Sequence, residues 1–387
     1  MLRVLFWMSV LWLCYVWIGY PLLLALISWR LRYRAASQED FVPSVSVLIS
    51  ARNEVKDIGW KVAETFSWDY PADRLEVLVG SDASTDGTDD ILQASHDPRL
   101  IFIRNQEQLG KNATLNRLAR LAQGDLLFFT DANTHVDIYS LRKLTRHFAD
   151  SRVGCVTGLE RNSVEANAST ITMGSSAYLE YESCLASLES RMGSVLVCDG
   201  SIYCLRRSLF SELDPDLAND LEHPIRVGAM GAKLLYEPRA RTFERCSTDP
   251  REEFSRRRRI AAQGALAFLR LRHLLRGLRL WQFVSRKLLR WLTAVPLVVV
   301  LATTFALRSS YWFEILFLLQ LICYFTALVG MWQNGPWQSY PILRLPFTVL
   351  LGNIAVFLGV LDACRGRRFA TWNIAELSRG IREEAGR

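Results

Sequence analysis

Three long stretches without a charged residue limit what this chain can fold into. They cover residues 4–29, 291–307 and 345–361. Each is close to the length that an α-helix needs to cross the apolar core of a bilayer. The residues between about 43 and 250 have instead the mixed composition of a soluble domain. We therefore predict a soluble catalytic or binding domain held between membrane helices.

The first apolar stretch is predicted to be a retained membrane anchor over 4–29. Its run of 26 uncharged residues is too long for the core of a signal peptide, and no cleavage site of small residues follows it. About three more membrane helices are predicted within 291–363. The whole chain is then divided into an anchor at 4–29, a soluble domain at 43–250, an interface segment at 251–290, membrane helices at 291–363 and a basic tail at 364–387.

Basic residues beside the apolar stretches predict the orientation. Arg30, Arg32 and Arg34 follow the anchor, which places the soluble domain in the cytoplasm of a multi-pass protein of the plasma (inner) membrane. Three further crossings would put the C-terminus outside. The tail at 364–387 carries six Arg against three Glu, however, and this favours the inside. Either the tail is an exception or one apolar segment is re-entrant.

The segment 251–290 concentrates positive charge, with eleven Arg and one Lys against two Glu. Its basic residues alternate with Leu, Phe and Trp just before an apolar stretch, which favours an anionic lipid surface over a nucleic acid. We predict amphipathic helices along the membrane face. Their apolar stripe is Phe268, Leu271, Leu275 and Leu278, and the side chains that reach lipid phosphates are Arg270, Arg272, Arg276 and Arg279.

The soluble domain shows strands that alternate with helical spacing. Apolar runs at 45–50, 75–80 and 125–130 predict buried strands, and 111–122 has the period of a helix. This alternation predicts an α/β fold with a parallel sheet, in which ligands bind beyond the carboxyl ends of the strands. Glu54, Asp82 and Asp131 each follow such a strand. A single Asp there is often only a turn or cap residue, but three at successive strand ends indicate a binding site.

Asp131 and Asn133 offer oxygen ligands two residues apart. Such ligands suit Mg²⁺ or Mn²⁺ rather than zinc, and Mg²⁺ usually keeps positions that phosphate oxygens fill. The sequence therefore predicts a divalent metal and a diphosphate at the end of the third strand. Neither a Walker loop nor a dinucleotide fingerprint has the required spacing in this chain.

Several motifs together resemble the membrane-bound family 2 glycosyltransferases, which include cellulose, chitin, hyaluronan and poly-N-acetylglucosamine synthases. The resemblance covers roughly residues 43–375. The matching motifs are VSVLISARNE at 45–54, VGSDASTDGT at 79–88, GKNATLN at 110–116, FTDANT at 129–134, GSIYCLRR at 200–207 and NDLEHPIRV at 219–227.

This resemblance implies a GT-A-like, Rossmann-type catalytic domain between an N-terminal anchor and C-terminal membrane helices. The implied activity is metal-dependent, inverting transfer of a hexose from a nucleotide sugar, with UDP-sugars as the expected donors. The implied acceptor is a saccharide or a lipid-linked molecule at the membrane, in the synthesis of a cell-surface polysaccharide or glycolipid. Membrane lipids are expected partners, and nucleic acid is not.

The family also implies roles for single residues. Ala51, Glu54 and Asp82 would hold the base and ribose of the donor, and Lys111 would lie near its base or diphosphate. Asp131 and Asn133 occupy the metal-binding D-x-D motif, whose last position is here a neutral Asn. Asp220 would be the general base, with a helix cap as the alternative interpretation.

On the acceptor side the chain departs from the polymerising synthases. Their Q-x-x-R-W motif corresponds to Arg256–Ile260, where Arg259 is kept but Arg256 and Ile260 replace Gln and Trp. Tyr181 and Glu182 recur at helical spacing and are predicted to line the acceptor side, with a helix core as the alternative. A processive synthase, an inactive nucleotide-binding scaffold and a transport subunit remain the competing functions.

Overall fold

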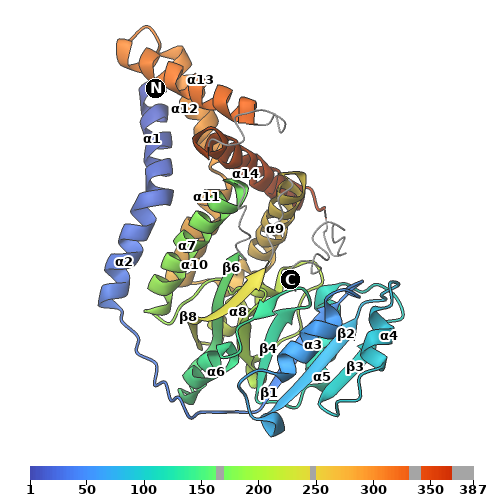
Figure 1. The fold of residues 1–387 in the computed structure, drawn as a ribbon. Coiled ribbons are helices and arrows are strands. Elements are labelled where there is room, and N and C mark those ends of the chain that lie inside the picture. Colours follow the sequence, from blue (N-terminus) through green and yellow to red (C-terminus); the bar gives the residue numbers. More distant parts are fainter. Residues whose placement is uncertain (163–169, 245–249, 331–340, 368–387) are drawn as a thin grey trace.

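The computed structural model describes the chain except for residues 163–169, 245–249, 331–340 and 368–387 (Figure 1). Most of the predicted basic tail at 364–387 therefore lies outside the described residues. The described part consists of a sheet domain from which a group of long helices extends (Figure 1).

One eight-stranded sheet forms the centre of the soluble domain, with the strand order β3-β2-β1-β4-β7-β6-β8-β5. Neighbouring strands from β3 to β4 are all parallel. The predicted strands at 45–50, 75–80 and 125–130 are confirmed as β1, β2 and β4. The bounds are β1 Val45–Ala51, β2 Leu75–Ser81, β3 Leu100–Arg104, β4 Leu126–Asp131, β5 His135–Val136, β6 Val153–Asn162, β7 Tyr203–Arg206 and β8 Lys233–Glu244.

The other half of the sheet is mixed. β7 is antiparallel to both β4 and β6, β6 is parallel to β8, and β5 is antiparallel to β8. β5 contains only two residues and lies just after the end of β4. This short strand therefore ties the loop after β4 to the far edge of the sheet.

Helices cover both faces of the sheet, which explains why β1 is apolar on both of its faces apart from two serines. Val47 and Ile49 face a core shared with α3 (Ile58–Phe66) and α6 (Ser140–Thr145). Leu48 faces the opposite core, which it shares with α5 (Lys111–Leu121) and α8 (Asn219–Ala229). The remaining helices of this domain are α4 (Thr88–Gln93) and α7 (Thr170–Ser190).

Among the described residues, three helices are long and apolar enough to cross a membrane, and a bent pair could add a fourth. The first runs over Leu2–Arg30 and comprises α1 (Leu2–Cys14), the π-helical η1 (Tyr15–Gly19) and α2 (Tyr20–Arg30). The others are α13 (Tyr311–Gly330) and the part of α14 (Pro341–Cys364) from Pro346 onwards.

The bent pair contains the shortest of the predicted membrane segments, 291–307. A helical stretch over Gly277–Trp291 meets α12 (Ala294–Ala306) at an angle of 54°. That stretch comprises α10 (Gly277–Phe283), the π-helical η6 (Val284–Leu288) and α11 (Leu289–Trp291). Such a bend fits either a broken membrane span or a re-entrant segment, which is one of the two alternatives for the side of the C-terminus.

The basic segment is helical, as predicted, but two of its arginines do not face lipid. α9 spans Pro250–Leu271 and is followed by a short turn, η5 (Arg272–Leu274). Arg270 pairs with Asp214 and Asp216, and Arg279 donates to the carbonyl oxygen of Pro224 at 2.6 Å. The prediction is therefore wrong for Arg270 and Arg279, because acceptors of the catalytic domain lie beside them.

The predicted apolar stripe is also directed inward. Leu271 and Leu275 are buried in a core with Phe283 and Trp291, and Phe268 packs against it. Arg272 and Arg276 are exposed, and their contact with lipid phosphates stays a prediction. The stripe belongs to two helices, because α9 ends at Leu271 and α10 begins at Gly277, and its spacing could not tell a lipid surface from a protein core.

Polar contacts join the N-terminal helix to the rest of the protein. The Tyr15 hydroxyl in η1 lies 2.8 Å from Ser285 Oγ in η6, so the two π-helical turns face each other. Trp12 Nε1 donates to the Leu289 carbonyl at 3.2 Å, and the Tyr20 hydroxyl donates to Glu189 of α7 at 3.1 Å. We call these contacts the anchor staple.

Candidate active site

Hydrogen bonds join the loops after β1 and β2 at the carboxyl ends of these strands. The backbone NH of Asn53 donates to Ser84 Oγ at 3.0 Å, and Asn53 Oδ1 accepts from the Thr85 NH at 2.8 Å. Asn53 and Ala83 have φ angles of 52° and 55°. Such left-handed backbone costs about 1–2 kcal/mol per residue and is often found at functional sites. The two loops thus form one rigid floor.

Ala51, Glu54 and Asp82 are buried in this floor. The Asp82 carboxylate accepts hydrogen bonds from Asn105 Nδ2 at 2.9 Å, from the Leu109 NH at 2.7 Å and from the Gly110 NH at 2.9 Å. As placed here, Asp82 fixes the loop that leads into α5. Direct contact of Ala51, Glu54 and Asp82 with a nucleotide stays a prediction.

Lys111 begins α5 beside the end of β4. Its Nζ donates to Asp131 Oδ1 at 2.5 Å. Gly80 allows α5 to pack closely on β2, because a Cβ at this position would lie 2.4 Å from a side-chain carbon of Thr114. The N-terminus of α5, which is the positive end of the helix dipole, therefore lies beside the Lys111 ammonium group. This arrangement favours an anionic ligand.

Asp131 and Asn133 lie at the end of β4 and in the loop that follows it. Asn133 Nδ2 points to Glu244 Oε1 at 3.4 Å, which leaves the amide oxygen of Asn133 available as a ligand. In the described part of the chain, no group of three His, Cys, Asp or Glu side chains could hold a metal ion alone. The two residues fit a hard divalent ion whose other ligands are phosphate oxygens or water.

Asp220 is the second residue of α8, so the structure does not support its interpretation as a helix cap, a position that Ala218 occupies. Its half-buried carboxylate is hydrogen-bonded by no other described side chain. Burial raises the pKa of Asp220, the charge of Lys111 opposes this shift and Asp131 adds to it. A raised pKa suits a carboxylate that accepts a proton near neutral pH.

A glycine and a buried network fix Asp220. A Cβ at Gly200 would lie only 3.7 Å from the Cβ of Asp220, so the 198–201 loop passes close to it. The Cys198 NH donates to the Asp220 carbonyl at 2.9 Å. The neighbouring Asn219 donates to the Tyr203 hydroxyl at 2.8 Å, and that hydroxyl lies 2.9 Å from His223 Nδ1.

Arg259 of α9 is a further charged residue on which Asp131 and Asp220 act. Burial lowers the pKa of its guanidinium, the neighbouring Arg256 adds to this effect, and the charges of Asp131 and Asp220 oppose it. Arg256 itself pairs with Glu253 at 3.1 Å. The charges of Lys111 and Asp131 thus act on Asp220, and those of Asp131 and Asp220 act on Arg259.

Tyr181 and Glu182 lie elsewhere, where α7 meets the segment 277–291 and the N-terminal helix. Glu182 pairs with Arg286 at 2.7 Å and also with Arg290. The rings of Tyr181 and Trp17 lie 5.8 Å apart between their centroids. These contacts place both residues in a junction of helices, and their contact with an acceptor stays a prediction.

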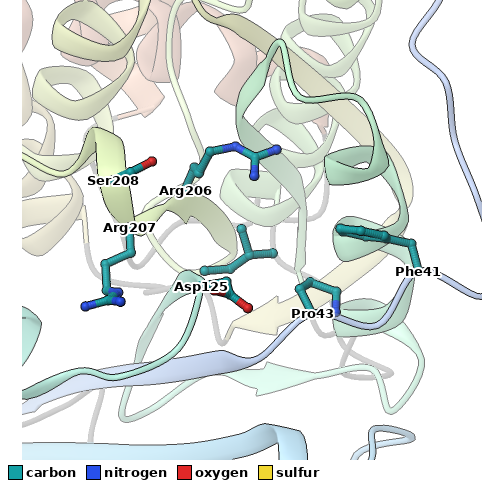
Figure 2. Close-up of a pocket in the computed structure, with 7 residues that line it drawn as sticks. Phe41, Pro43, Asp125, Arg206, Arg207 and Ser208 are labelled. Carbon is teal, nitrogen blue, oxygen red and sulfur yellow. The ribbon is translucent and has the colours of Figure 1, made fainter.

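A cavity of about 460 Å³ opens at the opposite end of β4 (Figure 2). Its lining includes Pro43, Asp125 and Arg206, which belong to the amino end of this half of the sheet or to segments beside it. Asp131 lies at the other end of the same strand. The cavity is therefore separate from the candidate active site.

No sequence pattern pointed to two buried residues below the loop after β4, Lys61 and Glu64. A Lys and a Glu three residues apart on a helix are typical of a solvated surface pair. Only the tertiary structure shows that both are buried.

The sheet domain has an α/β fold of the GT-A-like type. A solved structure of the mannosyltransferase PcManGT from Pyrobaculum calidifontis, in complex with GDP-Man and Mn²⁺, shares this fold. Its TM-score is 0.71 at 20% sequence identity, and the match covers 95% of this chain and 100% of that one. The model of the family described as Glycosyl transferase family 2 matches residues 46–213. This match covers less than half of the chain, so the similarity to the family is one of this segment.

Several curated relatives match part of the chain. The beta-monoglucosyldiacylglycerol synthase of Synechocystis sp. is 35% identical over 118 residues, 30% of this chain and 25% of that protein. The probable glycosyltransferase YdaM of Bacillus subtilis is 27% identical and covers 52% and 51%. The poly-beta-1,6-N-acetyl-D-glucosamine synthase of Staphylococcus aureus is 25% identical and covers 52% and 50%. The chain thus matches about half of these relatives' length or less.

Proposed function

We propose that the protein is an inverting, metal-dependent hexosyltransferase that moves a sugar from a nucleotide sugar to a membrane-associated saccharide or lipid-linked acceptor. The observation that carries this proposal is the group of Lys111, Asp131 and Asp220 at the carboxyl ends of the strands. It combines an anion site, oxygen ligands for a cation and a carboxylate of raised pKa. A glycolipid synthase and a polysaccharide synthase among the relatives support the same acceptor classes.

Each residue has a distinct role in the proposed reaction. Ala51, Glu54 and Asp82 shape the floor on which the base and ribose of the donor rest. Asp131 and Asn133 hold Mg²⁺ or Mn²⁺, which as a Lewis acid would stabilise the departing diphosphate. Lys111 adds a positive charge on the same side.

Asp220 acts on the acceptor. It removes the proton from the acceptor hydroxyl as that oxygen attacks the anomeric carbon and the bond to the diphosphate breaks. A single displacement of this kind inverts the anomeric centre. Arg259 lies close enough to Asp131 and Asp220 to balance negative charge as the diphosphate leaves.

The donor is proposed to be a UDP-sugar, although the structural neighbour PcManGT carries GDP-Man with Mn²⁺. Single transfer is favoured over polymerisation because Ile260 stands where the polymerising synthases have Trp. Its side chain is 48% exposed and offers no aromatic face on which an acceptor sugar could stack.

The membrane arrangement completes the proposal. The apolar helices at Leu2–Arg30, 277–306, Tyr311–Gly330 and Pro346–Cys364 would cross or enter the plasma (inner) membrane. The catalytic domain at 43–250 then lies in the cytoplasm, with the segment 251–290 at the membrane face. This placement keeps Asp220 close to an acceptor that is held in the bilayer.

A direct test uses the full chain, purified in lipid nanodiscs, with UDP-glucose, UDP-N-acetylglucosamine and GDP-mannose. We expect transfer to membrane lipids or saccharides with one of the UDP-sugars, and its loss in EDTA. Asp131→Ala should abolish transfer, whereas Asp125→Ala removes a carboxylate from the opposite end of β4 and should retain it. Transfer that survives both EDTA and Asp131→Ala would refute the metal role. Donor binding without transfer or hydrolysis would favour an inactive scaffold.

A further inference from the structure

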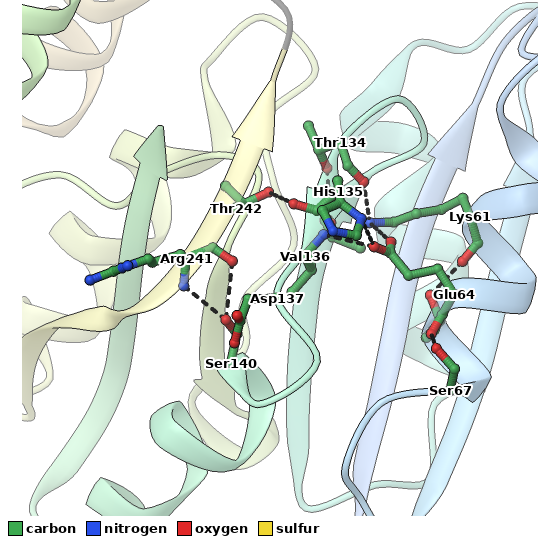
Figure 3. A network of polar contacts seen from close by, with 12 residues as sticks. Lys61, Glu64, Ser67, Thr134, His135, Val136, Asp137, Ser140, Arg241 and Thr242 are labelled. Carbon is green, nitrogen blue, oxygen red and sulfur yellow. Dashed lines mark hydrogen bonds and ion pairs between the residues drawn. The ribbon is translucent and has the colours of Figure 1, made fainter. Parts of the chain in front are cut away.

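Lys61 of α3 is a charged side chain with no solvent exposure, and no step of the proposed reaction uses it (Figure 3). An ammonium group is costly to bury unless it is paired and hydrogen-bonded. Burial lowers the pKa of Lys61 to about 8, and the charges of Glu64 and Asp131 oppose this shift. The contacts that Lys61 makes must therefore compensate the cost of its burial.

The contacts of Lys61 lead to the loop that carries the predicted metal ligands. Its Nζ donates to the carbonyl oxygen of Thr134 at 2.7 Å and lies 3.4 Å from Glu64 Oε2. Glu64 Oε1 accepts from the Val136 NH at 3.1 Å and also contacts His135 Nδ1. The pair thus holds three consecutive residues that directly follow Asp131-Ala132-Asn133, and Figure 3 shows both side chains reaching them.

The other side of this loop is fixed by β8. Thr242 Oγ1 donates to the His135 carbonyl at 2.9 Å, and the residues of β5 pair with Thr242 and Phe243 (Figure 3). The Asp137 NH donates to the Arg241 carbonyl at 3.0 Å. The loop is therefore clamped between α3 and β8. On the α3 side, the described polar contacts to its backbone come from Lys61 and Glu64.

We propose that Lys61 and Glu64 form a positioning pair, which sets the loop 131–136 so that Asp131 and Asn133 face the metal and diphosphate together. The inference rests on the proposed function, since it assigns the pair a task at that site. Neither side chain would touch the substrate. Groups of this kind, which orient metal ligands without binding the ion, typically change metal affinity about 10–100-fold when they are replaced.

The experiment measures metal binding directly, apart from catalysis. The purified full chain is titrated with Mn²⁺ in the presence of UDP, and free Mn²⁺ is followed by its electron paramagnetic resonance signal. Lys61→Met keeps the volume but removes the charge and the donor. We expect roughly 10–100-fold weaker Mn²⁺ binding. Transfer at saturating Mn²⁺ should recover at least in part, because the ligands themselves remain.

Ser67→Ala is the matched control. Ser67 Oγ donates to the Glu64 carbonyl at 2.7 Å, so its loss weakens the same helix without touching the loop. Mn²⁺ affinity should stay at the wild-type value in this variant. If Lys61→Met does not fold, Glu64→Gln takes its place, because an amide oxygen can still accept from the Val136 NH while the negative charge is lost. We expect a smaller but clear loss of Mn²⁺ affinity there.

The outcomes separate this inference from the proposed function. Wild-type Mn²⁺ affinity in folded Lys61→Met or Glu64→Gln, together with lost binding in Asp131→Ala, would overturn the positioning role alone. Equal weakening in Ser67→Ala would also overturn it, because the effect would then come from the stability of α3. Unchanged Mn²⁺ binding in Asp131→Ala would instead refute the metal site, and with it both proposals.

Discussion

Arg270 connects the basic segment to the loop that precedes the proposed general base, and its replacement by Gln gives a quantitative test. Its guanidinium pairs with Asp214 and, at 2.7 Å, with Asp216. The same loop is held from α5, because Asn112 Nδ2 donates to the carbonyl oxygens of Asp214 and Leu217 at 2.7 and 2.8 Å. Glu222 Oε2 also accepts from the Asp214 NH at 3.0 Å. Arg270→Gln should therefore release one of several supports of this loop.

The expected loss of stability follows from the two contacts. Hydrogen bonds to charged groups contribute about 1.5–3 kcal/mol each when they are well shielded. The Arg270 side chain is 32% exposed, so solvent screening reduces this contribution. Asp216 is only 7% exposed, so water can compensate its carboxylate only poorly when the Arg270 guanidinium is lost. We expect about 1–3 kcal/mol of destabilisation, which shifts Tm by on the order of 5 °C for a domain of this size.

The assay is thermal unfolding followed by tryptophan fluorescence, with transfer measured on the same samples. Arg272→Gln is the control, since it makes the same chemical change two residues further along at an exposed position. It should leave Tm unchanged and weaken only transfer to a membrane acceptor, an effect that disappears at high salt. Equal Tm values for the two variants, with equal losses of transfer, would mean that Arg270 faces lipid after all.

Three further predictions concern single carboxylate or amide groups. Asp220→Asn should lower the transfer rate about 10²–10⁴-fold while binding of the donor, measured by calorimetry, changes little; parallel loss of both would make Asp220 a donor or structural residue. Because its pKa is raised, wild-type transfer should fall on the acid side as Asp220 is protonated, and a pH–rate profile would show this limb. Asn133→Asp adds a negative ligand and should tighten Mn²⁺ binding in the same resonance titration, whereas weaker binding would exclude position 133 from the metal shell. Glu237→Gln should cost about 3–5 kcal/mol in denaturant unfolding, because it breaks a buried pair with Arg146, and a cost below 1 kcal/mol would refute that reasoning.

The parallel half of the sheet could be predicted because its signals are local. Each of β1, β2 and β4 is a short apolar run that ends in polar residues, and buried parallel strands need nothing more. The mixed half depends on pairings between distant segments, such as β6 with β8, for which no local pattern exists. The sequence therefore predicted the edge where the candidate site lies, but not how the loop after β4 is held.

The candidate site residues likewise include some that motifs could predict and some that they could not. Asp131 and Lys111 could be placed from motifs, and the structure brings them into contact. Asp82 was found by the same reasoning, yet its carboxylate is directed at the 105–110 loop. Lys61 could not have been found, because an amphipathic helix period does not show whether a lysine lies under a loop or in water. Burial of single charges is decided by tertiary contacts that one sequence does not display.

The anchor staple has a consequence for how this chain is assembled during synthesis. Trp12, Tyr15 and Tyr20 lie in a helix that is synthesised well before their partners Leu289, Ser285 and Glu189. Until then the polar edge of this helix must find temporary partners in lipid headgroups, water or the insertion machinery. Docking of the first helix is thus among the last steps to finish, after both the sheet and the segment 277–291 exist.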